Sequence, residues 1–113
     1  MNIQIFGKNK CFDTKKAQRY FKERGIKFQA IDLEQKGLSK GEYSNVKQAV
    51  GSMEALIDEK SKAYEKHNIA YLARAEAVEE ALLENPALFK SPIVRNGKQA
   101  TVGYTPEVWK EWE

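Results

Sequence analysis

Residues 3–17 have the sequence IQIFGKNKCFDTKKA, and this stretch decides the fold. Its first half alternates apolar and polar residues up to Phe6, a period-two pattern that predicts a short strand. Gly7–Lys10 is rich in turn-forming residues. From Asp13 or Thr14 the spacing becomes helical, and both side chains are residue types that cap the free amides of a helix start. A strand, a loop and a helix therefore follow one another, and Cys11 lies between the loop and the helix.

The pattern continues on the C-terminal side of this stretch. Gly25 suits the left-handed position that ends a helix. Residues 26–32 alternate again and predict a second strand. A strand–helix–strand connection of this length favours a right-handed unit with parallel strands.

Residues 39–89 contain no strand-like stretch and predict a helical insert. Ser39 and Glu42 form a capping-box pattern. The apolar spacing of residues 53–57 predicts a short helix, and residues 73–83 are rich in strong helix formers.

Strands return near the C-terminus. Residues 91–94 predict one strand, Asn96-Gly97 a hairpin turn, and residues 100–104 its partner. Thr105 is expected to cap a last helix that has Pro106 at its first position. Trp109 belongs to the apolar stripe of that helix and is expected in the core.

Together these elements predict one α/β domain over residues 1–113 with a thioredoxin-like arrangement of the glutaredoxin type. A four-stranded mixed sheet would carry the helical insert at about 39–89. The chain has 113 residues, 42% of them hydrophobic and 31% charged, which is typical of a single globular domain. No apolar run reaches the ~18 residues that a membrane span needs. No signal peptide is apparent at the N-terminus. We therefore expect a cytoplasmic protein with no membrane partner.

Cys11 is the candidate nucleophile, and as the only cysteine it cannot form an intramolecular disulfide. Without context, a lone cysteine is more often a small buried apolar residue than a reactive thiol. Here, the free amides of a helix start, at Phe12 and Asp13, would stabilise a thiolate. Thr14, three residues on, could donate a hydrogen bond to the sulfur. Since Thr14 cannot act as a second thiol, disulfide chemistry would need an external thiol.

Ser91-Pro92 is the second informative pair. In thioredoxin folds, a proline that opens the strand after the crossover is cis and forms a wall beside the catalytic cysteine. The alternative is an ordinary trans proline at the start of an edge strand.

Positive charge gathers around the cysteine. Residues 1–28 carry eight basic and two acidic side chains, a net charge of +6, whereas the whole chain is +3. One interpretation is a solvated helix face. The other is a cationic rim in which Lys8 and Lys10 attract an anion or stabilise the thiolate.

Three segments resemble the arsenate-reductase-like family: Phe6-Gly7, Cys11–Ala17, and Ser91–Val94 together with Val102–Tyr104. This family includes glutaredoxin-linked arsenate reductases, the Spx transcription regulators and a branch of uncharacterised reductase-like proteins, which residues 11–17 resemble most. The resemblance covers nearly the whole chain, including the insert. It implies a catalytic role for Cys11.

The resemblance does not carry over the three arginines with which the family's arsenate reductases hold the oxyanion. The matching places here are Ser91, a position at or near Asp58, and the segment Tyr104–Pro106. Neither serine nor lysine reproduces the bidentate contacts of arginine. Arg95 is the only arginine near the predicted site and is expected to help stabilise the thiolate or an anion there. Arsenate reduction is therefore not the expected activity.

Two functions follow from these observations. The first is a thiol-dependent oxidoreductase that uses Cys11 with glutathione or a glutaredoxin-like thiol donor, glutathione being a co-substrate and not a bound cofactor. The alternative is an Spx-like adaptor that binds RNA polymerase without turnover. Direct nucleic-acid binding has less support, because the basic helix lacks interleaved exposed aromatics. No metal site is expected, since His67 and Cys11 are single residues of their types.

Overall fold

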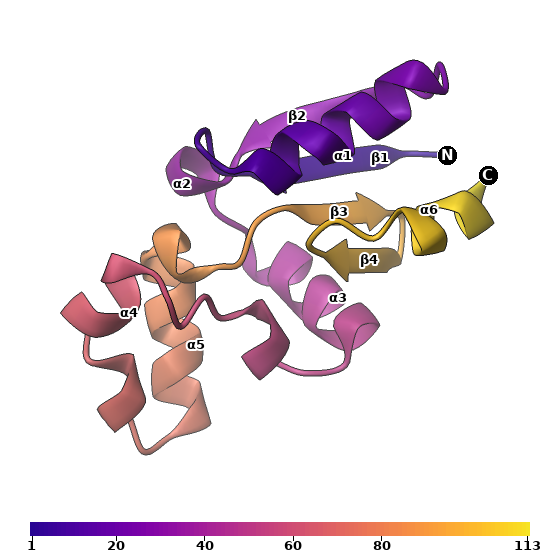
Figure 1. The fold of residues 1–113 in the computed structure, drawn as a ribbon. Coiled ribbons are helices and arrows are strands. Elements are labelled where there is room, and N and C mark those ends of the chain that lie inside the picture. Colours follow the sequence, from indigo (N-terminus) through magenta and orange to yellow (C-terminus); the bar gives the residue numbers. More distant parts are fainter.

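Four strands form one mixed sheet in the order β2-β1-β3-β4 (Figure 1). In the computed structural model, which describes residues 1–113, the strands are β1 (Ile3–Gly7), β2 (Phe28–Asp32), β3 (Ile93–Asn96) and β4 (Gln99–Val102). β1 is parallel to β2 and antiparallel to β3, and β3 is antiparallel to β4. This arrangement confirms the predicted mixed sheet, with the parallel pair first and the hairpin last.

Helix α1 (Phe12–Glu23) connects the two parallel strands. It buries Thr14, Ala17, Tyr20 and Phe21, which recur at helical spacing on one face. Gly25 has φ +68° and ends the helix as predicted. The start differs from the prediction: Cys11 itself is the N-cap residue, and no side chain caps this end. Asp13 and Thr14 therefore lie inside the first turn and do not cap it.

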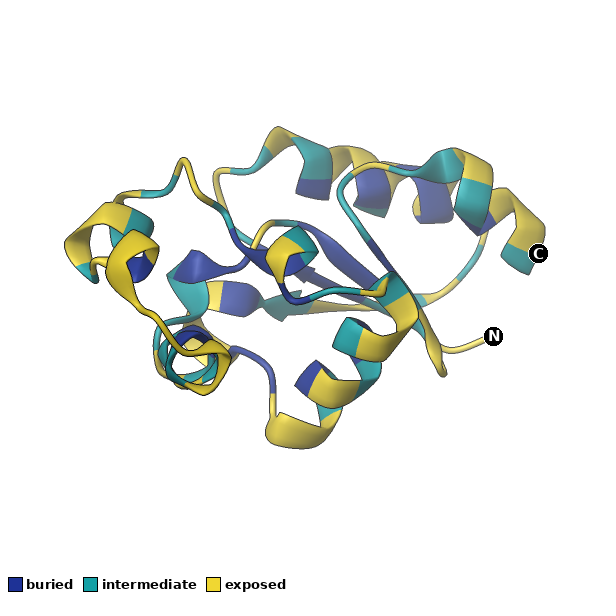
Figure 2. Cartoon of the chain, turned by 90° about the horizontal axis from the view of Figure 1, so that it is seen from below, coloured by how far each residue is buried: buried dark blue, intermediate teal, exposed yellow.

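Each face of the sheet has its own apolar core, as expected from the alternation of side chains along a strand. Ile3, Ile5 and Val94 pack with α1 and with Trp109 on one face. Phe6 and Ile93 point to the other face and pack with the insert. Figure 2 shows the buried strands between helices whose outer sides are exposed. The sheet is thus covered on both faces.

The insert consists of short helical segments between β2 and β3 (Figure 1). In chain order these are α2 (Leu33–Lys36), α3 (Lys40–Val50), the 3₁₀ turn η1 (Glu54–Leu56), α4 (Lys62–Lys66), the 3₁₀ turn η2 (Ile69–Tyr71), α5 (Ala75–Glu84) and the 3₁₀ turn η3 (Pro86–Leu88).

Within the insert, one predicted feature is present and one further feature was not predicted. The capping box of Ser39 and Glu42 is confirmed, with both reciprocal hydrogen bonds present. The insert holds one bridge that the sequence did not predict, between Ile57 and Phe89. That bridge fixes the segment after η1 against the approach to β3.

The hairpin turn lies one residue later than predicted. Asn96 still pairs with Gln99, so the two loop residues are Gly97 and Lys98. Asn96 remains in the strand because it also pairs with Ile3 of β1. Gly97 takes the positive φ of +61° that the turn requires.

Helix α6 (Pro106–Trp112) ends the chain on the α1 side of the sheet. Thr105 occupies its N-cap position but makes no capping hydrogen bond, contrary to the prediction. Trp109 is fully buried, and its indole N–H donates to Thr101 Oγ1 of β4 at 2.8 Å. No helix of this chain is long and apolar enough to cross a membrane.

Trp109→Ala is expected to lower the free energy of unfolding by about 3–5 kcal/mol, because it removes a large buried ring from the smaller core. Urea unfolding followed by circular dichroism measures this loss. Trp112→Ala is the matched control, since Trp112 is only partly buried. If both variants lost the same free energy of unfolding, the larger contribution expected from the buried Trp109 ring would be contradicted.

Candidate functional site

Cys11 is the last residue of the loop between β1 and α1, and its side chain is partly exposed. Its backbone is extended, with φ −88° and ψ 116°. The loop before it closes through a hydrogen bond from Cys11 N–H to Lys8 O at 3.1 Å. The thiol donates to the backbone carbonyl of Ser91 at 3.5 Å. The sulfur therefore lies beside the segment that enters β3, and the Ser91-Pro92 peptide bond there is cis.

The Ser91 hydroxyl joins three parts of the site. Its oxygen accepts a hydrogen bond from the backbone N–H of Lys8 at 2.9 Å. It also shares a hydrogen bond of 2.8 Å with Thr14 Oγ1 from the first turn of α1. Because each hydroxyl has one proton and one of the two protons lies in the bond between them, only one hydroxyl at a time can donate to the Cys11 sulfur while that bond is kept.

These groups set the acidity of the thiol. Partial burial of Cys11 raises its pKa, but hydrogen bonds from the hydroxyls of Thr14 and Ser91 and from the backbone amides of Thr14 and Asp13 outweigh that effect. The net result is a pKa below the ordinary value of a cysteine. Of the amides expected from the sequence, that of Asp13 contributes, whereas that of Phe12 is not among the contacts that lower the pKa.

Gly7 makes room for Thr14. A Cβ atom at Gly7 would overlap the Thr14 side chain, coming within 2.6 Å of Oγ1. The last residue of β1 must therefore be glycine for the hydroxyl of Thr14 to reach Ser91.

The two lysines of the loop differ in their surroundings. The Nζ of Lys8 donates to the carbonyl of Ala87 at 2.8 Å and forms an ion pair with Asp58 at 3.6 Å. Its charge is thus engaged by the insert. Lys10 is exposed and forms no ion pair.

A depression of about 550 Å³ lies over the sulfur, and its lining contains the basic residues Lys8 and Lys10 and the acidic residues Glu34 and Asp58. The immediate surroundings of Cys11 are therefore balanced in charge.

The basic excess of residues 1–28 lies instead on the outer side of α1. Lys15, Lys16 and Arg19 are exposed there. Phe12, directly after the cysteine, has 78% of its surface exposed, and Lys15 Nζ lies 5.9 Å from its ring centre. This surface is both cationic and aromatic, so the expectation that the basic helix lacks exposed aromatic residues is wrong for Phe12.

Arg95 is not brought to the site. Its guanidinium donates to Asn45 Oδ1 at 2.9 and 3.1 Å and to Gln4 Oε1 at 2.8 Å, and it lies 3.7 Å from a carboxylate oxygen of Glu42. The side chain ties β1 and β3 to α3. The expectation that it stabilises an anion at Cys11 is corrected accordingly.

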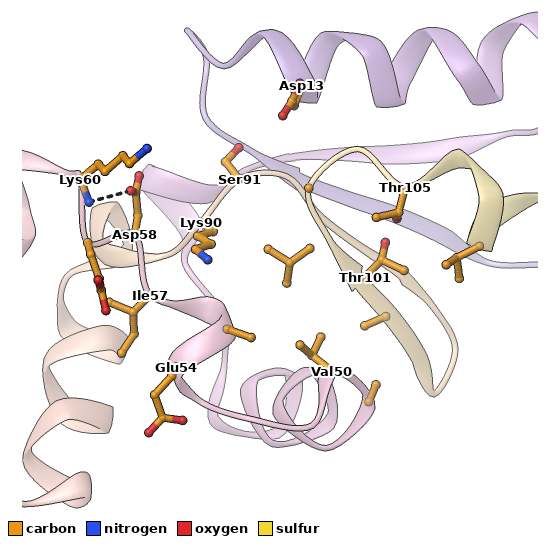
Figure 3. A pocket seen from close by; sticks show the side chains of 17 residues that line it. Asp13, Val50, Glu54, Ile57, Asp58, Lys60, Lys90, Ser91, Thr101 and Thr105 are labelled. Carbon is orange, nitrogen blue, oxygen red and sulfur yellow. Dashed lines mark hydrogen bonds between the residues drawn. The ribbon is translucent and has the colours of Figure 1, made fainter.

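A larger groove begins at Ser91 and extends along β4 (Figure 3). Its volume is about 1010 Å³. This groove could not be predicted from the sequence, because its walls come from segments far apart in the chain. The sequence also does not predict the pairing of Ser91 with Thr14, because it indicates Ser91 as part of a cis-proline wall and as the place of a missing arginine, and neither involves the serine hydroxyl. No cluster of histidine, cysteine, aspartate or glutamate side chains could hold a metal ion.

Comparisons with known structures place this geometry in a class. The glutaredoxin-like protein NrdH-redoxin from Escherichia coli matches with a TM-score of 0.51 at 15% identity, over 100% of this chain and 96% of that one. The arsenate reductase from Vibrio cholerae matches with a TM-score of 0.85 at 26% identity, over 98% of this chain and 97% of that one. The fold is therefore thioredoxin-like, with the helical insert shared by the second of these structures.

The sequence comparisons then give the family. The model of the ArsC family matches residues 6–112, and the chain belongs to this family. A curated relative, the global transcriptional regulator Spx 2 of Oceanobacillus iheyensis, is 28% identical over 106 residues, which are 92% of this chain and 78% of that protein. The protein is thus an ArsC-family member similar both to arsenate reductases and to Spx.

Thr14→Val and Ser91→Ala are each expected to raise the pKa of Cys11, because each removes a hydroxyl that stabilises the thiolate. The thiolate absorbance of the variants would then rise at higher pH than that of the wild type. Ser44→Ala, on the exposed side of α3, is the control. Superimposable titrations for all four proteins would contradict the role of the two hydroxyls.

Proposed function

We propose that this protein is a thiol-dependent oxidoreductase in which the Cys11 thiolate is the nucleophile. The observation that carries the proposal is a partly exposed sulfur whose pKa is lowered by the hydroxyls of Thr14 and Ser91 and by two amides of α1. A thiolate at neutral pH is the form of cysteine that attacks disulfides.

The first step would be attack of the Cys11 thiolate on one sulfur of a disulfide. A new disulfide forms between Cys11 and that sulfur, while the other sulfur leaves as a thiolate with the electron pair of the broken bond. Lys10 is the free cation of the loop and would stabilise the leaving thiolate, since Lys8 is engaged by Asp58.

The second step needs a thiol that the chain does not have. Thr14 occupies the place where a resolving cysteine would stand, and Cys11 is the only cysteine. An external thiol, such as that of glutathione or of a glutaredoxin-like protein, would attack the mixed disulfide and release the Cys11 thiolate. The external thiol forms a new disulfide with the substrate sulfur that Cys11 had bound, and a second external thiol then reduces that disulfide, so that two thiols supply the two electrons and end as one disulfide.

We do not extend the proposal to arsenate. An arsenate oxyanion needs uncompensated cations around the sulfur, preferably planar guanidinium groups. The depression over Cys11 holds two lysines and two carboxylates, and Arg95 is bound elsewhere.

Exposure to oxidised glutathione at neutral pH is expected to give a mixed disulfide on Cys11 within minutes, because the lowered pKa keeps part of the thiol ionised there. Mass spectrometry of the intact protein measures the added glutathione. The reaction should slow as the pH falls below the pKa of the thiol and should be absent in Cys11→Ser.

A small-molecule thiol of ordinary acidity provides the reference rate for this reaction. A Cys11 that reacts no faster than the reference, or whose rate midpoint lies at or above about 8.5, would refute a thiolate activated by its surroundings.

The alternative function is an adaptor that binds RNA polymerase without turnover, and the similarity to Spx 2 favours it. Its contact surface would be the outer side of α1, where Phe12 is exposed beside Lys15, Lys16 and Arg19. Such binding would not require the sulfur.

Under this alternative, the tagged protein should recover polymerase subunits from a native bacterial lysate, identified by mass spectrometry. Cys11→Ser should recover them equally well, whereas the charge reversals Lys16→Glu and Arg19→Glu together should reduce recovery about tenfold through lost electrostatic complementarity. Lys110→Glu, an exposed lysine on α6, is the control. Recovery of no polymerase subunit by any of these proteins would reject the adaptor.

A further inference from the structure

Strand β4 is an edge strand with unused backbone hydrogen-bonding groups. The N–H of Gly103 donates to the carbonyl of Pro92 at 2.8 Å, which sets the phase of the β3–β4 ladder. Because hydrogen-bonded pairs alternate along an antiparallel ladder, Thr101 bonds to β3, whereas Ala100 and Val102 direct their N–H and C=O groups away from it. No other segment of the chain bonds to these groups.

The groove described above wraps around this free edge. Its lining includes Ala100 and Val102 of β4, Val50 of α3 on one face of the sheet, and Thr105 and Val108 on the other face, where α6 begins (Figure 3). Lining residues from both faces mean that neither helix covers the edge. An uncovered strand edge of this kind is a template for pairing with another extended chain.

The charges of the groove walls fit a polypeptide. The wall opposite β4 carries Glu54, Glu59, Lys60 and Lys90, none of which forms an ion pair. Charges of both signs, together with an aliphatic floor, suit the mixed side chains of a protein segment.

The groove is continuous with the cysteine. Ser91 and Asp58 line both the groove and the depression over the sulfur. Since β4 runs antiparallel to β3, its Val102 end lies beside Pro92, at the same end of the sheet as Cys11. A chain added to the free edge is separated from β3 by β4 itself, so it must extend beyond the Val102 end of β4 to reach Ser91, whose carbonyl is 3.5 Å from the sulfur.

From this geometry we infer that the free edge of β4 binds an extended segment of a substrate protein, as an added strand, and that this segment carries the disulfide that Cys11 attacks. The inference rests on the proposed function and narrows its substrate class to protein disulfides. Backbone pairing with Ala100 and Val102 would supply affinity, and the groove walls would hold the alternating side chains.

The experiment uses a short peptide of alternating valine and threonine that ends in cysteine, activated as a mixed disulfide with thionitrobenzoate. The Cys11 thiolate attacks the peptide sulfur, a peptide–Cys11 disulfide forms, and thionitrobenzoate leaves with the electron pair and is measured by its absorbance. Glutathione activated in the same way is the reference probe. Release of thionitrobenzoate tests the proposed function, and amide hydrogen exchange of the resulting adducts by NMR tests the added strand.

In the peptide adduct, the amides of Ala100 and Val102 should exchange at least about tenfold more slowly than in the glutathione adduct, because only the peptide pairs with them. Val102→Pro removes one outward N–H without touching the β3–β4 bonds, and it should slow the reaction with the peptide about tenfold while leaving that with glutathione unchanged. Val102→Ala controls for the lost side chain.

The outcomes separate the two proposals. No thionitrobenzoate release from either probe overturns the proposed function. Release with no added protection at Ala100 and Val102 leaves that function standing and overturns the added strand. Protection of these amides in the free protein that grows with protein concentration would assign the edge to a second copy of the chain, and would also overturn it.

Discussion

The site depends on the hydroxyl of Ser91, because it is the one group that contacts all three segments around the sulfur. It accepts from the Lys8 amide in the β1–α1 loop and pairs with Thr14 in the first turn of α1, while its own backbone leads into β3. Without this contact, the bond from the Cys11 thiol to the Ser91 carbonyl would be the side-chain bond that remains between this helix start and the segment that enters β3. Gly7 belongs to the same constraint, since any larger residue would displace Thr14. The acidity of Cys11 is thus a consequence of how the sheet, loop and helix are joined.

The distribution of charge changes the chemical interpretation of the site. The net charge of +6 over residues 1–28 suggested a cationic rim, but the structure puts most of it on the outer side of α1. Near the sulfur, Asp58 of the insert compensates Lys8. A balanced pocket does not attract a small, highly charged oxyanion, whereas it accommodates a neutral disulfide. The cationic surface of α1 is therefore not part of the pocket over the sulfur.

The fold could be predicted from the sequence because its signals are local. Strand alternation, the helical spacing of Ala17, Tyr20 and Phe21, and the capping box at Ser39 each lie within a few residues. The predictions from the sequence were wrong where a contact between distant segments decides the structure. Asn96 stays in its strand because it pairs with both Ile3 and Gln99, and this moved the turn by one residue. Thr105 is a capping residue type at the N-cap position of α6, yet its oxygen is buried and makes no hydrogen bond.

Within the site, too, the positions set by local geometry could be predicted, and those set by distant contacts could not. Cys11 and Thr14 stand three residues apart at a helix start, so their proximity follows from helix geometry alone. Ser91, Asp58 and Arg95 reach their positions through the crossover and the sheet register, which sequence spacing does not encode. Arg95 shows this most clearly: it lies in β3, only three residues beyond Pro92, but its register with Gln4 turns it toward Asn45 of α3 and away from the sulfur. A residue close in sequence to a site is therefore part of it only if the backbone there directs its side chain to it, as the helix does for Thr14 and as the register of β3 does not for Arg95.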